Sequence, residues 1–254
     1  MIVESRYLDG SYLNANPDWD RGDSSWKADL VAKLLMENRI IPEALCEVGC
    51  GSGDILINLS VAFPESKMTG FDISPQAAAF WKDHPRPSRH GSIEFFLADF
   101  LTEKTPRYDV LMLLDVFEHV RDPFTFLESC RLRADHFVFH VPLDLSAFSV
   151  VRKSPLLEAR RKVGHLHFYT KELALATLRE CGYDLIQWGY TGAGINVPGR
   201  TWKSRLASFP RRVAYAVNKD FGVRLLGGET LLVLAKPAVT PNNPGDRGVR
   251  GAAF

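Results

Sequence analysis

The sequence alternates short apolar runs with stretches of helical periodicity, and this alternation constrains the fold more than any other feature. The apolar runs have the length of buried strands, and large residues between them recur with the period of a helix. Such a pattern is typical of an α/β fold, in which helices cover both faces of a mostly parallel sheet. The predicted strands are 44–48, 67–71, 93–97, 110–114, 136–141, 185–190 and 230–235. The predicted helices are 25–37, 54–63, 75–83, 123–131 and 170–181.

Two segments are too long to be simple connections. Residues 142–169 join the fifth strand to the next helix, and this length predicts a functional loop or a small subdomain. Within residues 191–228, large apolar residues recur at helical spacing among Lys and Arg. This predicts a helical insertion before the last strand, bent or broken at Pro210. Residues 237–254 are rich in Pro, Gly and Ala, so we expect a disordered tail.

Composition excludes several classes of protein. Hydrophobic residues make up 46% and charged residues 24% of the 254 residues, which argues against a disordered or fibrous chain. No apolar run approaches the roughly 18 residues of a membrane span, and the first residues lack the pattern of an export signal. We therefore expect a cytoplasmic protein. The four cysteines show neither CxxC pairs nor zinc-type spacing, so we expect free thiols.

The motif E-V-G-C-G-S-G-D at 47–54 stands between the first predicted strand and a predicted helix. Glycines let the backbone turn sharply and bring its N–H groups against a ligand at the positive end of the helix. The spacing reads G-x-G-x-G, whereas the loop that binds a dinucleotide pyrophosphate reads G-x-G-x-x-G. The motif predicts a cofactor loop, and the alternative is a glycine-rich turn without a ligand.

Acidic residues follow the next two predicted strands. Asp72 comes about twenty residues after the glycine loop, where a carboxylate can accept both hydroxyls of a ribose. Asp72 can equally cap the helix predicted from Pro75. Asp99 follows the third strand and can accept from an adenine amino group, while the ring of Phe100 can pack on the base.

Together these residues resemble the class I S-adenosylmethionine-dependent methyltransferases, over about residues 44–182 with 230–235 as the last strand. The resemblance implies a Rossmann-like three-layer sandwich with a seven-stranded, mostly parallel sheet whose last strand is antiparallel. It implies S-adenosylmethionine as the methyl donor and S-adenosylhomocysteine as the product. The residues it assigns to the cofactor are Glu47, Gly49, Cys50, Gly51 and Gly53 for the methionine part, Asp72 and Ile73 for the ribose, Ala98, Asp99 and Phe100 for the adenine, and Asp115 beside the methionine.

The segments 115–120, 140–142 and 164–170 resemble the small-molecule branch of that family, as in ubiquinone-biosynthesis O-methyltransferases. Base N-methyltransferases carry Asn or Asp followed by Pro-Pro and an aromatic residue after the fourth strand, and this chain has Asp115-Val116-Phe117 there. The resemblance therefore predicts transfer of a methyl group to a small molecule, most simply at a hydroxyl. Nucleic acid is not the expected partner, because the sequence shows no RNA-binding module.

Two histidines are the candidates for catalysis. His119 and His165 lie in segments predicted at the carboxyl edge of the sheet, where an imidazole can take the proton of an acceptor hydroxyl. Some members of the family hold a divalent metal with an acid-x-x-Glu-His motif and a later His. Here the matching residues are Asp115, Glu118, His119 and either His165 or His167. A metal would lower the pKa of a bound hydroxyl, and it remains an alternative beside purely structural histidines.

The resemblance also divides the chain. Residues 1–40 form an N-terminal lid and helix, with Tyr7, Tyr12 and Trp19 placed to close over the substrate. Residues 41–236 form the methyltransferase domain, in which 142–169 is the acceptor loop. Basic residues in that loop are compatible with an anionic acceptor. Residues 200–219 are compatible with contact with an anionic membrane surface.

Three other functions remain open from the sequence alone. They are methylation of an amine, cofactor binding without turnover, and a nicotinamide-dependent oxidoreductase. The last fits the fold class but not the glycine spacing of its loop. The sequence names neither the acceptor nor the oligomeric state.

Overall fold

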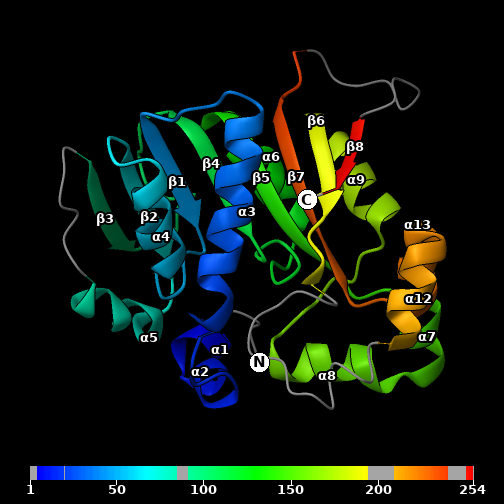
Figure 1. Cartoon of the computed structure of the whole chain (residues 1–254). Coiled ribbons are helices and arrows are strands. Elements are labelled where there is room, and N and C mark those ends of the chain that lie inside the picture. Colours follow the sequence, from blue (N-terminus) through cyan, green and yellow to red (C-terminus); the bar gives the residue numbers. More distant parts are fainter. Residues whose placement is uncertain (1–4, 20, 85–90, 194–208, 240–249, 254) are drawn as a thin grey trace.

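The computed structural model of the chain describes residues 5–19, 21–84, 91–193, 209–239 and 250–253. It contains one sheet in the order β3-β2-β1-β4-β5-β7-β6-β8 (Figure 1). The strands are β1 Ala44–Val48, β2 Lys67–Asp72, β3 Ser92–Leu97, β4 Tyr108–Leu114, β5 Ala134–Leu143, β6 Tyr183–Tyr190, β7 Glu229–Pro237 and β8 Arg250–Ala253. The strands β1 to β5 pair in parallel, and β7 lies antiparallel between β5 and β6. The predicted seven-stranded sheet with an antiparallel last strand is confirmed in β1 to β7, and β8 adds an eighth strand at the edge.

Helices cover both faces of the sheet (Figure 1). One face carries α3 Ser24–Glu37 and α4 Asp54–Ala62, and the other carries α6 Pro123–Cys130 and α9 Lys171–Glu180. Strand β4 shows why both faces are apolar. Its residues Val110, Met112 and Leu114 belong to the core under α3 and α4, whereas Leu111 and Leu113 belong to the core under α6 and α9. Successive side chains of a strand point to opposite faces, so this central strand is buried on both.

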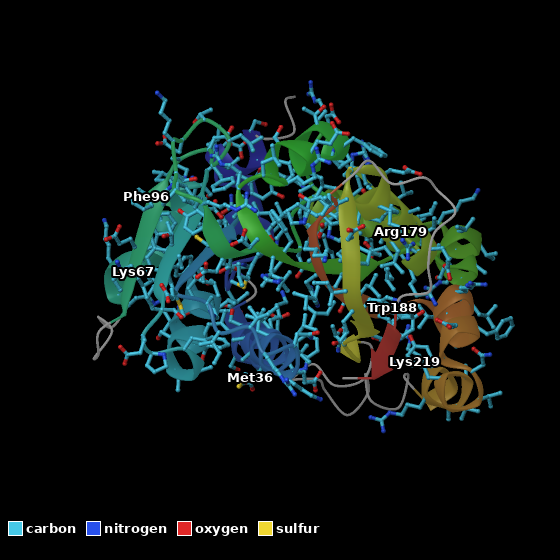
Figure 2. All side chains as sticks on the ribbon, turned by 90° about the horizontal axis from the view of Figure 1, so that it is seen from above. Met36, Lys67, Phe96, Arg179, Trp188 and Lys219 are labelled. Atoms are coloured by element: carbon cyan, nitrogen blue, oxygen red, sulfur yellow. The ribbon has the colours of Figure 1, made fainter. Side chains whose placement is uncertain are left out.

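Shorter helices lie at the carboxyl edge of the sheet and beyond it. They are α1 Ser5–Leu8, α2 Ser11–Ala15, the 3₁₀ turn η1 Arg21–Asp23, α5 Pro75–Ala78, the 3₁₀ turn η2 Phe80–Asp83, α7 Ala147–Arg152, α8 Ser154–Lys162, α12 Phe209–Val217 and α13 Lys219–Leu226. Seen from above, the sheet extends from the side of Phe96 on β3 to that of Trp188 on β6 (Figure 2). No helix in the described ranges is long and apolar enough to cross a membrane.

Helices form in both of the segments that are too long to be simple connections, 142–169 and the described part of 191–228. Between 142 and 169 the chain forms α7 and α8, and the described end of the 191–228 segment forms α12 and α13. The predicted helix, bent or broken at Pro210, begins within the residues that the structure does not describe, so this prediction is not tested. The described part, α12 Phe209–Val217, includes Pro210. Residues 194–208 lie outside the described part of the chain.

The prediction of a disordered tail over 237–254 is wrong for part of it. Pro237 still belongs to β7, and Arg250–Ala253 form β8, which pairs in parallel with residues 187–190 of β6. The side of β6 away from β7 offers free backbone N–H and C=O groups, and a strand can add to such an edge without a hydrophobic sequence. Residues 240–249 lie outside the described residues.

Candidate active site

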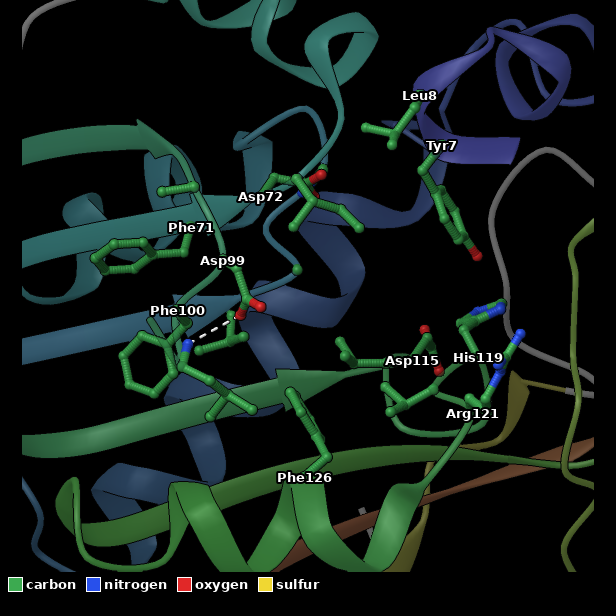
Figure 3. A pocket seen from close by; sticks show the side chains of 18 of the residues that line it. Tyr7, Leu8, Phe71, Asp72, Asp99, Phe100, Asp115, His119, Arg121 and Phe126 are labelled. Atoms are coloured by element: carbon green, nitrogen blue, oxygen red, sulfur yellow. Dashed lines mark hydrogen bonds between the residues drawn. The ribbon is translucent and has the colours of Figure 1, made fainter. Parts of the chain in front are cut away.

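A cavity of about 650 Å³ lies at the carboxyl ends of the parallel strands (Figure 3). Nine of the residues predicted at the site line it: Gly49, Gly51, Asp72, Ile73, Ala98, Asp99, Phe100, Asp115 and His119. A second hollow of about 310 Å³ adjoins the first, sharing Gly51, Asp115 and His119 with it, and contains Glu47, Cys50 and His165. The structure thus brings together all of the residues predicted for the cofactor and for catalysis except Gly53, which lines neither cavity; Glu118 and His167, predicted as alternative metal ligands, also line neither.

The glycine loop connects β1 to α4 and carries positive φ angles. Gly51 has a φ of +53°, and a Cβ atom there would lie 2.7 Å from Nε1 of Trp19. Gly53 has a φ of +81°, and its Cβ would lie 2.5 Å from the ring of Phe95. Gly51 is therefore required so that Trp19 can cover the loop, whereas Gly53 is required by packing at the start of α4.

Asp72 ends β2 beside the glycine loop. Its Oδ2 accepts the N–H of Gly51 at 2.8 Å, and its Oδ1 accepts the N–H of Ser74 at 2.8 Å. Burial raises the pKa of Asp72, against the effect of these backbone donors. The N-cap of α5 is Ser74, which accepts from Ala77, so Asp72 does not cap that helix. Each oxygen keeps an acceptor position that a ribose hydroxyl can use.

Ala98, Asp99 and Phe100 form the part of the cavity that follows β3. Oδ1 of Asp99 accepts the N–H of Leu101 at 2.9 Å (Figure 3). Phe100 is buried, and the guanidinium of Arg133 lies 4.7 Å from the centre of its ring. Arg133 therefore covers one face of Phe100, and contact of this ring with an adenine stays a prediction.

Asp115 directly follows β4 and has a φ of +55°, a conformation that non-glycine residues rarely adopt. Its Oδ1 accepts from Nδ1 of His140 on β5 at 2.6 Å, and its Oδ2 lies 2.8 Å from Nζ of Lys27 on α3. Burial alone would raise the pKa of Asp115, but His140 and Lys27 outweigh it and hold that pKa well below its usual range. The carboxylate therefore stays charged inside the site.

Glu47 is buried beneath the loop and lines the second hollow. Its Oε2 makes no hydrogen bond with any described residue. Burial raises the pKa of Glu47 well above its usual value, although Lys27 acts against this rise. A buried carboxyl oxygen without a partner is costly, and a cationic ligand would satisfy it. The site thus fits the ammonium group of the expected cofactor.

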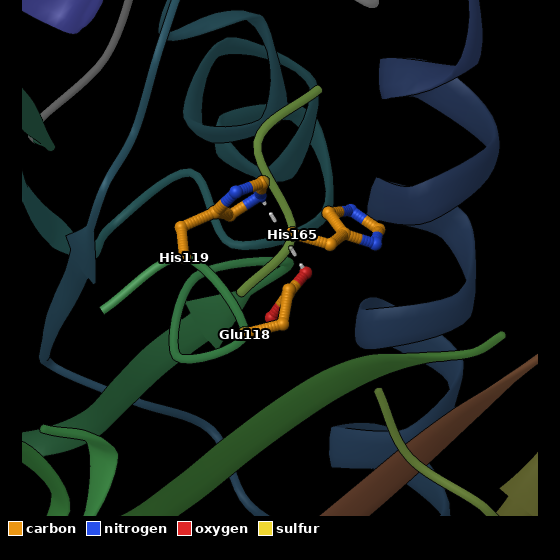
Figure 4. Close-up of side chains that lie close together, drawn as sticks. All are labelled: Glu118, His119 and His165. Atoms are coloured by element: carbon orange, nitrogen blue, oxygen red, sulfur yellow. Dashed lines mark ion pairs between the residues drawn. The ribbon is translucent and has the colours of Figure 1, made fainter. Parts of the chain in front are cut away.

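Glu118, His119 and His165 form a cluster beside these cavities (Figure 4). One nitrogen or oxygen from each lies within 4.8 Å of the others. Burial raises the pKa of Glu118 well above its usual value, and burial together with the charge of His165 lowers the pKa of His119 to about 4. Oε1 of Glu118 lies 3.7 Å from Nε2 of His119, and both pKa shifts disfavour the charged forms of this pair.

The predicted metal set is only partly assembled. Glu118, His119 and His165 are close enough to share an ion. Asp115 is instead engaged by His140 and Lys27, and Nε2 of His167 lies 3.0 Å from the carbonyl oxygen of Val120.

Asp144 is a site residue that sequence reasoning missed. Its Oδ2 accepts a hydrogen bond from Nδ1 of His165. The bond fixes the ring and leaves its Nε2 to accept a proton. Lys27 and His140 were missed in the same way, because no local motif marks a residue whose partner lies on another element.

Aromatic residues of the N-terminal segment cover the large cavity. Tyr7, Leu8, Tyr12 and Trp19 all line it, and Tyr7 stands across the cavity from Asp115 and His119 (Figure 3). The ring centres of Tyr12 and Trp19 are 4.8 Å apart. This arrangement is consistent with the predicted lid, whose movement stays a prediction.

Comparison with known proteins adds independent findings. Residues 46–135 match a family model described as a methyltransferase domain. A ubiquinone biosynthesis O-methyltransferase from Actinobacillus pleuropneumoniae serotype 7 is 24% identical over 165 residues, which are 59% of this chain and 70% of that protein. An (S)-coclaurine N-methyltransferase from Thalictrum flavum is 24% identical over 123 residues, which are 46% of this chain and 34% of that protein.

Solved structures share the fold. The crystal structure of magnesium protoporphyrin IX methyltransferase from Synechocystis PCC 6803, with bound S-adenosylhomocysteine, superposes with a TM-score of 0.57. It is 17% identical, and the match covers 84% of this chain and 83% of that chain. At this identity the likeness concerns the arrangement of strands and helices.

Proposed function

We propose that the chain is a class I S-adenosylmethionine-dependent methyltransferase that acts on a small molecule, that it methylates a hydroxyl oxygen, and that His165 takes the hydroxyl proton. The match of residues 46–135 to a methyltransferase domain, the similarity to known methyltransferases and the shared fold support this proposal. The similarity to an O-methyltransferase of ubiquinone biosynthesis supports oxygen as the methylated atom. A hydroxyl must lose its proton as its bond to the methyl carbon forms, and an imidazole suits this transfer at neutral pH.

The hydrogen bond between Asp144 and His165 is the observation that carries the proposal. A carboxylate on Nδ1 holds the ring in the tautomer whose Nε2 accepts a proton, and it stabilises the imidazolium that forms. His119 is less suited to take the proton, because its pKa of about 4 leaves it neutral and weakly basic. We therefore assign proton removal to His165 and contact with the acceptor to His119.

The remaining predicted residues hold the donor. Glu47 would accept from the ammonium of the methionine part, Asp72 from the ribose hydroxyls and Asp99 from the adenine amino group. S-adenosylmethionine supplies an electrophilic methyl group on a sulfonium. Transfer would form an oxygen–carbon bond and break the sulfur–carbon bond of the donor, while Nε2 of His165 would take the hydroxyl proton. The chain contributes mainly by orienting the two reactants.

A metal-dependent reaction remains the alternative, because Glu118, His119 and His165 lie close enough together to hold a metal ion. These residues would hold a divalent ion, and Asp144 would orient His165 from behind, as carboxylates commonly do for metal-bound histidines. Such an ion would lower the pKa of an acceptor hydroxyl. Full activity in excess chelator, with no response to Mg²⁺, Mn²⁺ or Zn²⁺, would exclude this alternative.

The proposal is tested by release of S-adenosylhomocysteine from a panel of phenols, catechols and matched amines. We expect turnover with hydroxyl acceptors, and we expect His165→Gln to lower kcat by about 100-fold or more while S-adenosylmethionine still binds. Turnover with amines alone would favour N-methylation, which the N-methyltransferase similarity also supports. Binding without turnover on any acceptor would favour the non-catalytic function.

The proposal also includes an anionic acceptor, but the residue that would bind its charge differs from those expected. The basic residues of 150–163 line neither cavity, whereas Arg121 lines the large one beside His119 (Figure 3). Contact of 200–219 with a membrane stays a prediction, and residues 200–208 lie outside the described residues.

A further inference from the structure

The N-terminal segment is bonded to the end of α8, far away in the sequence. Four consecutive carbonyl oxygens there accept hydrogen bonds from its side chains. Nη1 and Nη2 of Arg6 donate to Arg160 at 3.4 Å and to Arg161 at 3.0 Å, Nδ2 of Asn16 donates to Lys162 at 3.3 Å, and the hydroxyl of Tyr7 donates to Val163 at 3.5 Å.

These carbonyls are the ones that a helix end leaves without a partner in the helix. The N–H groups of Val163 and Gly164 both donate to the carbonyl oxygen of Ala159. Helical hydrogen bonding therefore ends at Ala159, one residue before the first of these four carbonyls. Such carbonyls are usually satisfied by water or by nearby residues. Here the partners come from α1 and from Asn16, which caps the end of α2, and the guanidinium of Arg6 adds a positive charge at the negative end of α8.

Arg6 also lies directly on Gly164. A Cβ atom on Gly164 would be 2.0 Å from Nη1 of Arg6, and Gly164 has a φ of +91°. The next residue is His165. On its other side, the N–H of Leu166 donates to the carbonyl of Glu118 at 2.8 Å. The backbone that carries His165 is therefore held by the lid on one side and by the active-site turn on the other.

The same short segment reaches both cavities. The ring of Tyr7 stands edge-on to that of His119, with 6.1 Å between their centres, and Trp19 covers Gly51. We propose that Arg6 is a positioning residue: as the lid closes over the donor, Arg6 caps α8 and fixes the backbone of His165. Closure of the lid would then cover the donor and position His165 at the same time. The role of His165 in this inference rests on the proposed function.

Arg6→Ala and Gly164→Ala test the inference in the full chain. Gly182→Ala is a matched control, because Gly182 has a φ of +82° and its Cβ would lie 2.0 Å from Nη1 of Arg131, far from the lid. We expect both test variants to lower kcat by about tenfold, since small misplacements of a reacting group are costly. The KM for the acceptor should change little, and the control should keep kcat within about twofold of wild type.

Combining the two test variants sharpens the experiment. Once Ala replaces Arg6, the clash at position 164 is gone and only the backbone strain of Ala at a φ of +91° remains, so the double variant should lose less activity than the two single losses predict together. Amide hydrogen exchange should quicken in residues 5–19 and in 160–166 together, and in neither segment of Gly182→Ala. A wild-type kcat in Arg6→Ala, or losses that add in the double variant, would overturn the proposal.

The exchange measurement separates this inference from the proposed function. If the wild-type protein transfers no methyl group to any hydroxyl, the proposed function fails, and exchange alone decides the contact. Unchanged exchange of 160–166 in Arg6→Ala would then show that the lid does not hold the His165 segment. Faster exchange of both segments would support the coupling without its catalytic role.

Discussion

Asp115 shows how a single residue can stay charged inside a protein. Its pKa is lowered in the folded chain, because His140 and Lys27 outweigh the effect of burial. Such a carboxyl adds stability above its unfolded pKa of about 4, and this contribution is lost as the pH falls toward the folded pKa.

Asp115→Asn removes the charge without disturbing the backbone, since Asn tolerates the φ of +55°. As the pH falls from about 6 to about 3, we expect the Tm of the wild type to fall more than the Tm of the variant. Thermal melts of both proteins across this range check the expectation. A difference that does not change with pH would mean that the carboxylate is not held ionised.

Glu47 is the opposite case, because burial raises its pKa. A carboxyl with a raised pKa favours folding below its unfolded pKa, and this contribution is lost as the pH rises through the folded value. We therefore expect Glu47→Gln to raise the Tm of the ligand-free protein at pH 7.5. The same change should weaken S-adenosylmethionine binding by about tenfold, because a neutral amide accepts a weaker hydrogen bond from an ammonium than a carboxylate does. Calorimetric titration that finds unchanged affinity would remove Glu47 from the donor site.

Residues at the site were predictable only where a local pattern marked them. Asp72, Asp99 and Asp115 each follow an apolar run, and the carboxyl ends of parallel strands meet at one edge. Asp144 and His140 became recognisable only through partners 21 and 25 positions away, which the topology brings together. Long-range pairing of this kind leaves no periodic signal in the sequence.

At the scale of elements, the sequence predicted the seven main strands to within about two residues of their ends, and all but one of the five helices to within about one residue. β1 coincides with the predicted 44–48, because a buried strand between turn residues is a local signal. The helix predicted over 75–83 is divided into α5 and η2 at Ala79, and β8 was not foreseen. Short turns and edge strands depend on what lies next to them rather than on their own pattern.

The start of α4 allows a prediction with a close control. Gly53 and Gly10 are both N-cap residues with a φ of +81°, but a Cβ on Gly53 would be 2.5 Å from Phe95, whereas Gly10 has nothing nearer than 3.9 Å. We expect Gly10→Ala to cost about 1 kcal/mol from backbone strain, and Gly53→Ala about 1–3 kcal/mol more from the clash. Urea denaturation measures both. Equal losses would mean that Phe95 moves aside freely, and a loss of donor affinity alone would return Gly53 to the cofactor site.

The whole molecule gathers acidic groups at one edge of its sheet. Glu47, Asp72, Asp99 and Asp115 come from four neighbouring strand ends, and three of them surround the glycine loop. A dinucleotide would bring two phosphates against these carboxyl groups, whereas S-adenosylmethionine brings a sulfonium and an ammonium. Charge therefore favours the methyl donor over a nicotinamide cofactor, in agreement with the spacing of the loop.

The thermal stability of the protein reports which cofactor the acidic edge accepts. A ligand that binds only the folded chain stabilises it by about 2.7 kcal/mol at 100 times its Kd. For a chain of this size each kcal/mol raises the Tm by about 2–4 °C, so S-adenosylmethionine should raise it by about 5–10 °C. NAD at the same concentration should leave the Tm unchanged, and NADP serves as a second anionic control. A shift with NAD and none with S-adenosylmethionine would contradict the assignment of the cavity, because the acidic edge would then be accommodating phosphate.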